Sequence, residues 1–155
     1  MAGTVDARLK ELGIDIPTPP TPAANYVPFV KSGNLVFVSG QIPMVAGKIE
    51  GIGTVGEDYS VDEAKDIARI CAINLIAQAK VAAGGDLDRV QRVVKLGGFV
   101  NCVDHFIEQP EVINGASDLM VAVFGDKGRH ARFAVGSNSL PRGVAVEVEG
   151  VFEIA

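Results

Sequence analysis

Two ionisable residues stand out because each interrupts an apolar stretch. In the run HARFAVGSNSLPRGVAVEVEG, residues 130–150, Arg132 lies near the start of one apolar stretch and Glu147 lies inside the next. An arginine guanidinium can bind the carboxylate of a small molecule through two parallel hydrogen bonds, which lysine cannot match. A glutamate nearby can orient the arginine or a water molecule, or exchange a proton.

The two stretches predict a β-hairpin whose turn falls within NSLPRG, residues 138–143. Side chains alternate between the faces of a strand, and directly opposed residues share a face. Antiparallel pairing about this turn places Arg132 opposite Glu147 or Glu149, on the sheet face away from the helices. His130 has the same strand parity as Arg132 and is a candidate for the same cavity. The spacing leaves two interpretations open, a carboxylate-binding site and a salt bridge that sets the register of an assembly.

The elements upstream are predicted from hydrophobic periodicity and from capping and turn residues. They are a helix within the first thirteen residues, a hairpin over 25–40, a helix from Ser60 to Gly84, a strand over 90–103 bent at Gly97-Gly98, and a helix over 110–124. This order predicts an α+β fold with a mainly antiparallel sheet and two main helices packed on one face. Two helices cover only one sheet face, so we expect self-association through the other.

Length and composition favour a single domain spanning residues 1–155. Hydrophobic residues make up 48% of the chain and charged residues 21%, so it can bury a core without disulfides. Residues 1–24 are predicted to form a short N-terminal helix and a proline-rich extension. The sequence shows no secretory signal pattern and no apolar run long enough to span a bilayer. We therefore expect a cytoplasmic protein with no membrane partner.

Charge, cysteine and glycine patterns narrow the partners and cofactors. The net charge of −5 and the lack of a Lys/Arg cluster argue against a nucleic-acid partner. Cys71 and Cys102 lack CxxC spacing and nearby histidines, so neither a metal site nor a disulfide is predicted. GIGTVG, residues 51–56, matches a dinucleotide-binding pattern, but no helix follows it directly, and Glu57 and Asp58 would repel phosphate. These patterns therefore predict neither a metal site nor a dinucleotide-binding site.

Three stretches together resemble the Rid family of reactive-intermediate deaminases, also called the YjgF or L-PSP family. They are NLVFVSGQIP (34–43), VKLGGFVNCVDHF (94–106), and ARFAV followed by LPRGVAVEVEGV (131–151). The resemblance runs in order from Tyr26 to the end, about four fifths of the chain. It implies a chorismate-mutase-like α+β fold and a homotrimer with ligand sites in clefts between subunits. The implied reaction, which uses no cofactor, hydrolyses 2-imino or 2-enamino acids, such as 2-aminoacrylate or 2-aminocrotonate, to 2-oxo acids and ammonia.

The resemblance also implies roles for individual positions. Arg132 corresponds to the arginine that holds the substrate carboxylate, and Glu147 to the glutamate that helps position or activate water. Five further positions correspond to substrate-binding residues: Tyr26, Ser39, Gly40, Phe106 and Asn114. Orientation, a placed water and proton exchange can suffice for this reaction, because the imine carbon is already electrophilic.

Three functional hypotheses follow. The first is a cytoplasmic, homotrimeric hydrolase similar to 2-iminobutanoate/2-iminopropanoate deaminase. The second is a noncatalytic module that binds 2-oxo acids or other small carboxylic acids through Arg132. The third is endoribonuclease activity, which has been attributed to some members of the family. The acidic charge and the lack of a histidine pair or basic patch argue against the third.

Overall fold

The computed structural model describes residues 3–20 and 25–155, so part of the predicted extension, residues 1–2 and 21–24, lies outside the described residues. Short 3-10 helices are labelled η. The elements in chain order are α1 (Thr4–Glu11), β1 (Phe29–Ser32), β2 (Leu35–Gln41), β3 (Met44–Val45), β4 (Lys48–Ile49), α2 (Val61–Ala82), η1 (Leu87–Arg89), β5 (Val90–Asn101), α3 (Gln109–Phe124), η2 (Gly125–Gly128), β6 (Ala131–Ser137), η3 (Pro141–Gly143) and β7 (Val146–Ile154).

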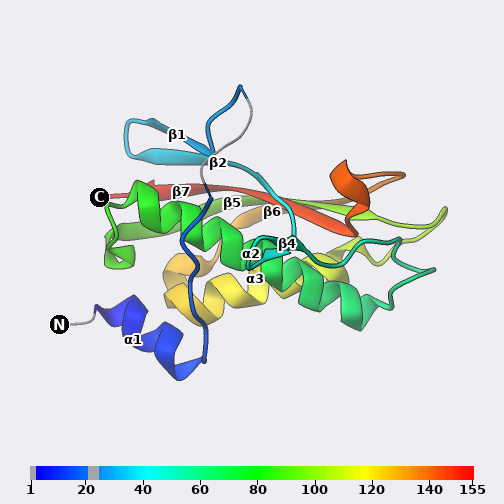
Figure 1. Ribbon diagram of the computed structural model, residues 1–155. Helices are drawn as coiled ribbons and strands as arrows, with labels where there is room; N and C mark the ends of the chain where they lie inside the picture. Colours follow the sequence, from blue (N-terminus) through cyan, green and yellow to red (C-terminus); the bar gives the residue numbers. More distant parts are fainter. Residues whose placement is uncertain (1–2, 21–24) are drawn as a thin grey trace.

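A five-stranded sheet in the order β1-β2-β7-β5-β6 forms one layer, and α2 and α3 cover one of its faces (Figure 1). Its pairings are antiparallel except for that between β5 and β6, which is parallel. The strands β3 and β4 form a separate two-stranded ribbon. This layering confirms the predicted α+β class and the position of both main helices on one face.

Several predicted helix ends and turns are confirmed. The Ser60 hydroxyl accepts a hydrogen bond from the Glu63 amide at 3.1 Å and donates one to the Glu63 carboxylate at 3.2 Å, so it caps α2. Pro110 lies in the first turn of α3, where its missing N–H costs nothing. Gly125 ends that helix with a φ of 64°, and Gly33 turns the first hairpin with a φ of 60°.

The core lies between the sheet and the two main helices. Alternate residues of β7 point toward the helices, and Val146, Val148 and Phe152 are fully buried. They belong to one cluster with buried residues of the helices such as Leu75 and Met120. Burying a side chain of this size stabilises a fold by about 1.5–3 kcal/mol. This apolar layer therefore holds α2 and α3 against the sheet.

The glycine pair in β5 makes room for neighbouring side chains and does not interrupt the strand, so a bulge there, one form of the predicted irregularity, is wrong. The strand runs unbroken through Gly97 and Gly98, and its register shifts against β7 lie at residues 90–95. A Cβ at Gly98 would lie 2.5 Å from Cγ1 of Ile113, and one at Gly97 would lie 2.5 Å from Cζ of Phe133. The two glycines therefore let α3 approach one face and an aromatic ring lie on the other.

The predicted C-terminal hairpin is also wrong, because β5 lies between β6 and β7. Arg132 pairs with Leu96 of β5, and Leu96 pairs with Gly150 of β7 on its other side. The order β5, α3, β6 forms a strand-helix-strand crossover, which is the usual connection between parallel neighbours. The residues after β6, including η3, then carry the chain past the end of β5 to β7. Arg132 and Glu147 are therefore not cross-strand neighbours.

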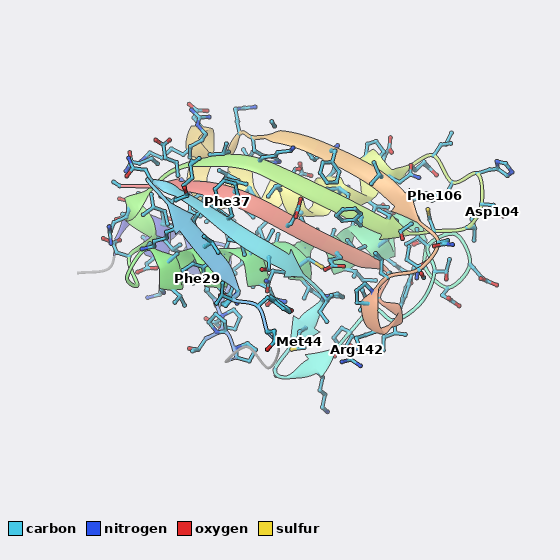
Figure 2. The ribbon with its side chains drawn as sticks, turned by 90° about the horizontal axis from the view of Figure 1, so that it is seen from above. Phe29, Phe37, Met44, Asp104, Phe106 and Arg142 are labelled. Atoms are coloured by element: carbon cyan, nitrogen blue, oxygen red, sulfur yellow. The ribbon has the colours of Figure 1, made fainter. Side chains whose placement is uncertain are left out.

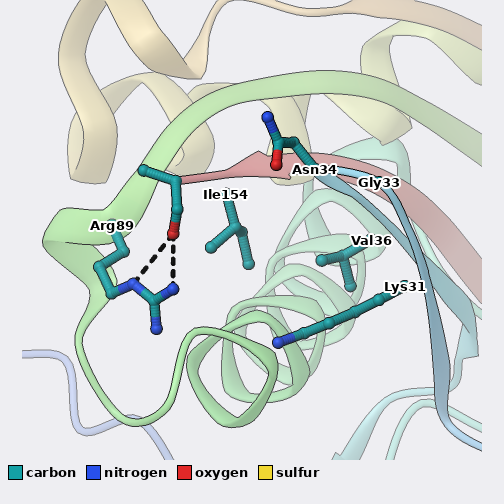
Figure 3. A pocket seen from close by; sticks show the side chains of 7 residues that line it. Lys31, Gly33, Asn34, Val36, Arg89 and Ile154 are labelled. Atoms are coloured by element: carbon teal, nitrogen blue, oxygen red, sulfur yellow. Dashed lines mark hydrogen bonds between the residues drawn. The ribbon is translucent and has the colours of Figure 1, made fainter.

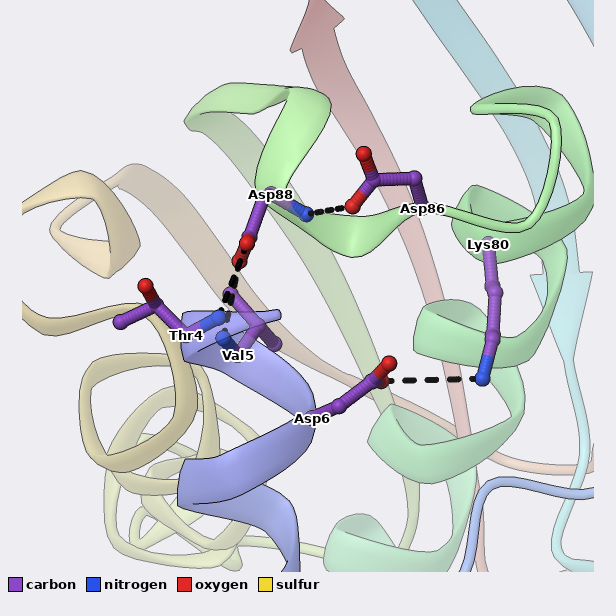
Figure 4. A network of polar contacts seen from close by, with 6 residues as sticks. All are labelled: Thr4, Val5, Asp6, Lys80, Asp86 and Asp88. Carbon is purple, nitrogen blue, oxygen red and sulfur yellow. Dashed lines mark hydrogen bonds and ion pairs between the residues drawn. The ribbon is translucent and has the colours of Figure 1, made fainter. Parts of the chain in front are cut away.

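The first helix is attached to the body of the protein by a carboxylate distant in sequence. Asp88 in η1 accepts hydrogen bonds from the backbone amides of Thr4 and Val5, both at 2.8 Å (Figure 4). These two bonds lower the pKa of Asp88 below its usual range. Lys80 of α2 also lies 3.7 Å from the Asp6 carboxylate. Asp88 thus performs the N-capping role that no side chain at the start of α1 performs.

Replacement of the capping carboxylate should loosen α1. For Asp88→Ala we expect faster amide hydrogen exchange over residues 4–11 and a loss of about 1 kcal/mol, as for other helix caps. The pKa of Asp88 is lower in the folded state than in the unfolded state. Its stabilising contribution is therefore present above the unfolded pKa and is lost as pH falls through the folded pKa. The variant and wild type should therefore converge in acid. Asp15→Ala, which removes an exposed carboxylate after the helix, is the control; equal exchange in both variants would contradict the cap.

Candidate functional site

Arg132 lies on the edge strand β6 and reaches α3. Its Nη1 donates hydrogen bonds to Oδ1 of Asn114 at 2.8 Å and to Oγ of Ser117 at 3.2 Å. Asn114 and Ser117 are three residues apart on the helix, which places them on one face. The structure therefore brings Arg132 together with one predicted site residue, Asn114, and with Ser117, which the sequence analysis missed. Their spacing along α3 was the signal that could have found the serine.

The polar cluster continues from Ser117 to His130. Oγ of Ser117 lies 2.8 Å from Nε2 of His130, and Nδ1 of the same ring lies 2.6 Å from the carbonyl oxygen of Gly128. His130, Arg132, Asn114 and Ser117 are all half-buried. We call these four residues the arginine cluster.

Glu147 lies on the other face of the sheet. Its neighbours along β7, Val146 and Val148, point into the core, and its carboxylate sits where a Cβ at Gly40 would collide with it. Burial raises the pKa of Glu147, and repulsion by Glu149 raises it further. The carboxylate therefore holds a proton more readily than an ordinary glutamate and is a stronger base when ionised.

Ser39 and Gly40 lie beside Glu147 at an irregularity in β2, where the register with β7 shifts between Val38 and Gln41. The Ser39 hydroxyl donates to the carbonyl of Val27 at 3.0 Å. This bond ties the strand to the segment that carries Tyr26. We call Ser39, Gly40 and Glu147 the glutamate cluster.

Two predicted site residues lie apart from both clusters. Tyr26 is 63% exposed and precedes β1. Phe106 lies in the loop between β5 and α3 and packs partly against the core (Figure 2). The side-chain amide of Gln109 donates a hydrogen bond to the Phe106 carbonyl at 2.9 Å. Neither residue is hydrogen-bonded to Arg132 in the described part of the chain, where Arg132 bonds only to Asn114 and Ser117, so a single chain does not bring all predicted site residues together.

The prediction that Arg132 and Glu147 share a sheet face is wrong within one chain. Arg132 pairs with Leu96, which is buried under the helices, whereas Glu147 pairs with Phe99 on the uncovered face. The error followed from the hairpin assumption, because inserting β5 between the two strands removes the constraint that linked their faces. The two clusters therefore lie on opposite sides of the sheet.

Two surface hollows lie away from both clusters. One, of about 140 Å³, has Arg89 at its side, but the guanidinium donates through Nε and Nη2 to the Ala155 carbonyl and through Nη1 to the Ala83 carbonyl (Figure 3). The other, of about 270 Å³, lies between α2 and α3 and is lined by Lys65 and Asp118, among others. Neither hollow is lined by Arg132 or Glu147. The guanidinium of Arg89 in the first hollow is already hydrogen-bonded to backbone carbonyls, including that of Ala155, the residue after β7.

The described side chains and helices offer neither a metal cluster nor a membrane span. Within residues 3–20 and 25–155, no three His, Cys, Asp or Glu side chains gather closely enough to hold a metal ion. Nor does any helix in that part of the chain have the length and apolar character needed to cross a membrane.

Comparisons with known proteins agree with this fold. Protein TCP17 of Trypanosoma cruzi is 49% identical over 156 residues, which cover 99% of this chain and 96% of TCP17. The crystal structure of Atu1372 from Agrobacterium tumefaciens, a protein of unknown function, is 52% identical with a TM-score of 0.91 and covers 97% of this chain and 92% of its own. RidA from an Antarctic Psychrobacter is 27% identical with a TM-score of 0.60, covering 88% and 94%.

A family model places the chain more broadly. The model described as "YjgF/chorismate_mutase-like, putative endoribonuclease" matches residues 6–149, which include the arginine and glutamate clusters and every element from β1 to η3. The match extends over most of the chain, and the fold is the one that the sequence resemblance implied. The protein therefore belongs to the YjgF/chorismate-mutase-like family, the Rid family.

Proposed function

We propose that the protein hydrolyses 2-imino and 2-enamino acids to 2-oxo acids and ammonia in a cleft between subunits. The observation that carries this proposal is the state of the Arg132 guanidinium. Both of its hydrogen bonds within the described chain leave from Nη1, so Nε and Nη2 remain available. These two nitrogens present parallel N–H groups, the arrangement that binds a carboxylate bidentately.

The glutamate cluster supplies what the reaction needs besides a carboxylate clamp. An enamine first tautomerises to the imine, its C3 gaining a proton as its nitrogen loses one. Water then adds to the imine carbon, and Glu147 accepts the water proton as the C–O bond forms. Proton transfer to nitrogen and collapse of the addition product then release ammonia and leave the 2-oxo acid. A pKa raised toward neutrality suits this role, because a base acts best when its pKa lies near the working pH.

A complete site requires two subunits. Arg132 and Glu147 lie on opposite faces of one sheet, so a substrate held by one Arg132 would meet the Glu147 of a neighbouring subunit. The uncovered sheet face offers a surface for such a neighbour, since Val30, Phe37 and Val135 are 54%, 46% and 42% exposed. Figure 2 looks onto this face and shows Phe37 on it. A homotrimer, as the family resemblance implies, would join the half-sites in cyclic order.

The direct test is release of 2-oxobutanoate from 2-aminocrotonate generated in situ by a threonine dehydratase. Wild type should accelerate release over the buffer rate. Arg132→Ala should lose about 1.5–3 kcal/mol of binding, the value of a hydrogen-bonded charge pair, which corresponds to about 10- to 150-fold in kcat/KM. Arg132→Lys should recover little, because an ammonium cannot reproduce the two-nitrogen edge. Equal rates in all three proteins would contradict the proposal.

Glu147→Gln should separate catalysis from stability. We expect a loss of about 10²- to 10⁴-fold in kcat, the usual contribution of a positioned base, and loss of the acid limb of the pH–rate profile.

The same substitution should affect stability. The pKa of Glu147 is raised in the folded state, so the folded protein binds more protons than the unfolded chain at pH values between the unfolded and folded pKa. The ionised carboxylate thus destabilises the fold above the folded pKa, and this penalty disappears as pH falls. The amide should raise the denaturation midpoint at neutral pH; a lowered midpoint would contradict this account.

The assembly can be tested by light scattering in solution. We expect a mass three times the 16.2 kDa of one chain. Phe37→Glu should shift the mass toward one chain and abolish turnover, because it places a charge on the uncovered sheet face. Val81→Glu is the matched control, since Val81 is 51% exposed on α2, away from that face. An active wild-type monomer would rule out the inter-subunit site.

Carboxylate binding without turnover is the second candidate function. It is favoured by the separation of the half-sites, because the arginine cluster is already assembled in one chain while Glu147 is not part of it. Binding of 2-oxobutanoate by wild type, lost in Arg132→Ala, together with no acceleration of 2-aminocrotonate hydrolysis, would select this function over the deaminase.

A further inference from the structure

We propose that Ser117 and His130 form a relay that holds the Arg132 guanidinium in its carboxylate-binding orientation. The inference rests on the proposed role of Arg132 and adds two positioning residues that the family resemblance did not assign. Neither residue touches the substrate in this account. Both act through Arg132.

The hydrogen-bond partners determine the direction of each donor. A backbone carbonyl can only accept, so Nδ1 of His130 must carry the proton that it shares with Gly128 at 2.6 Å. In the neutral imidazole Nε2 is then an acceptor, and the Ser117 hydroxyl, 2.8 Å away, donates to it. The serine oxygen keeps its lone pairs for Nη1 of Arg132 at 3.2 Å. The protons therefore point in one direction along Arg132, Ser117, His130 and Gly128.

The far end of the relay is rigid. Gly128 closes η2 against α3 so tightly that a Cβ at this position would collide with the backbone carbonyl of Met120. The carbonyl that accepts from His130 is therefore fixed relative to the helix that carries Ser117. The hydrogen bond to this fixed carbonyl holds the imidazole in one orientation and one tautomer.

The near end of the relay determines which edge of the guanidinium is free. Nη1 has two hydrogens, and Asn114 and Ser117 each accept one. With both occupied, the planar group cannot rotate without breaking a bond, and its Nε and Nη2 edge is presented to a ligand. Without the serine the group keeps a single anchor and can pivot about it. Part of the binding free energy would then be lost in ordering the side chain.

The test compares ligand affinity and turnover in the full-length assembly. The probe is 2-oxobutanoate in titration calorimetry, with 2-aminocrotonate as the substrate. Ser117→Ala should weaken binding about five- to tenfold, the scale of one ordinary intramolecular hydrogen bond, because the bonds of Nε and Nη2 to the ligand itself remain. KM should rise by a similar factor while kcat and the unfolding midpoint change little, because the lost interaction acts on binding.

Two variants and a control separate a relay from a packing effect. Ser117→Thr restores the hydroxyl and should restore affinity, which a role in helix packing would not explain. His130→Phe keeps a planar ring but cannot accept the serine proton, so it should also weaken binding. The control is His105→Asn, which changes the other histidine. Asparagine tolerates the φ of 63° at this position, and the variant should bind 2-oxobutanoate as wild type does.

The outcomes distinguish this inference from the proposed activity. Equal 2-oxobutanoate affinity in wild type and Ser117→Ala would overturn the relay and leave the deaminase proposal standing. Weaker binding in Ser117→Ala with rescue by Ser117→Thr, but no turnover in any protein, would support the relay and refute the deaminase. No binding of 2-oxobutanoate by wild type would overturn both.

Discussion

The parallel pairing of β5 with β6 is the constraint on which the arginine cluster depends. Parallel neighbours require a crossover, and here the crossover is α3. The helix returns the chain to the sheet edge, where the half-buried Arg132 donates hydrogen bonds to Asn114 and Ser117. Gly98 permits this arrangement, because any larger residue would push Ile113 and the helix away from the strand. The orientation of the guanidinium thus follows from the way β5 and α3 pack.

The glutamate cluster depends on a different part of the sheet. Gly40 leaves space for the Glu147 carboxylate at the irregularity of β2, and burial with Glu149 nearby raises the pKa of that carboxylate. A carboxylate in such surroundings is costly to keep ionised, which is a common feature of functional sites. One chain therefore carries a positively charged half-site under the edge of the sheet and an acidic half-site on its open face. We infer that the two are used together through assembly.

Sequence patterns predicted the elements well and their neighbours less well. The Ser60 cap, the Pro110 start and the Gly33 turn are local signals, and each is present in the structure. The final pairing was wrong because two apolar strands separated by a short turn-like run resemble a hairpin, and nothing local shows that β5 lies between them. The Asp88 cap on α1 was not predictable for the same reason, since it joins segments more than eighty residues apart. Ser117 was missed because its role depends on Arg132 being on the helix side.

The most direct test of the shared site is complementation between two variants with impaired activity. Arg132→Ala and Glu147→Gln subunits are unfolded together, refolded as mixed assemblies and assayed for 2-oxobutanoate release from 2-aminocrotonate. If each site takes Arg132 from one subunit and Glu147 from its neighbour, random mixing in a cyclic trimer restores about a quarter of the sites. We predict that activity in the mixture returns to about a quarter of the wild-type value and exceeds that of either variant refolded alone. A mixture that stays inactive while wild type refolded in the same way is active would contradict the account.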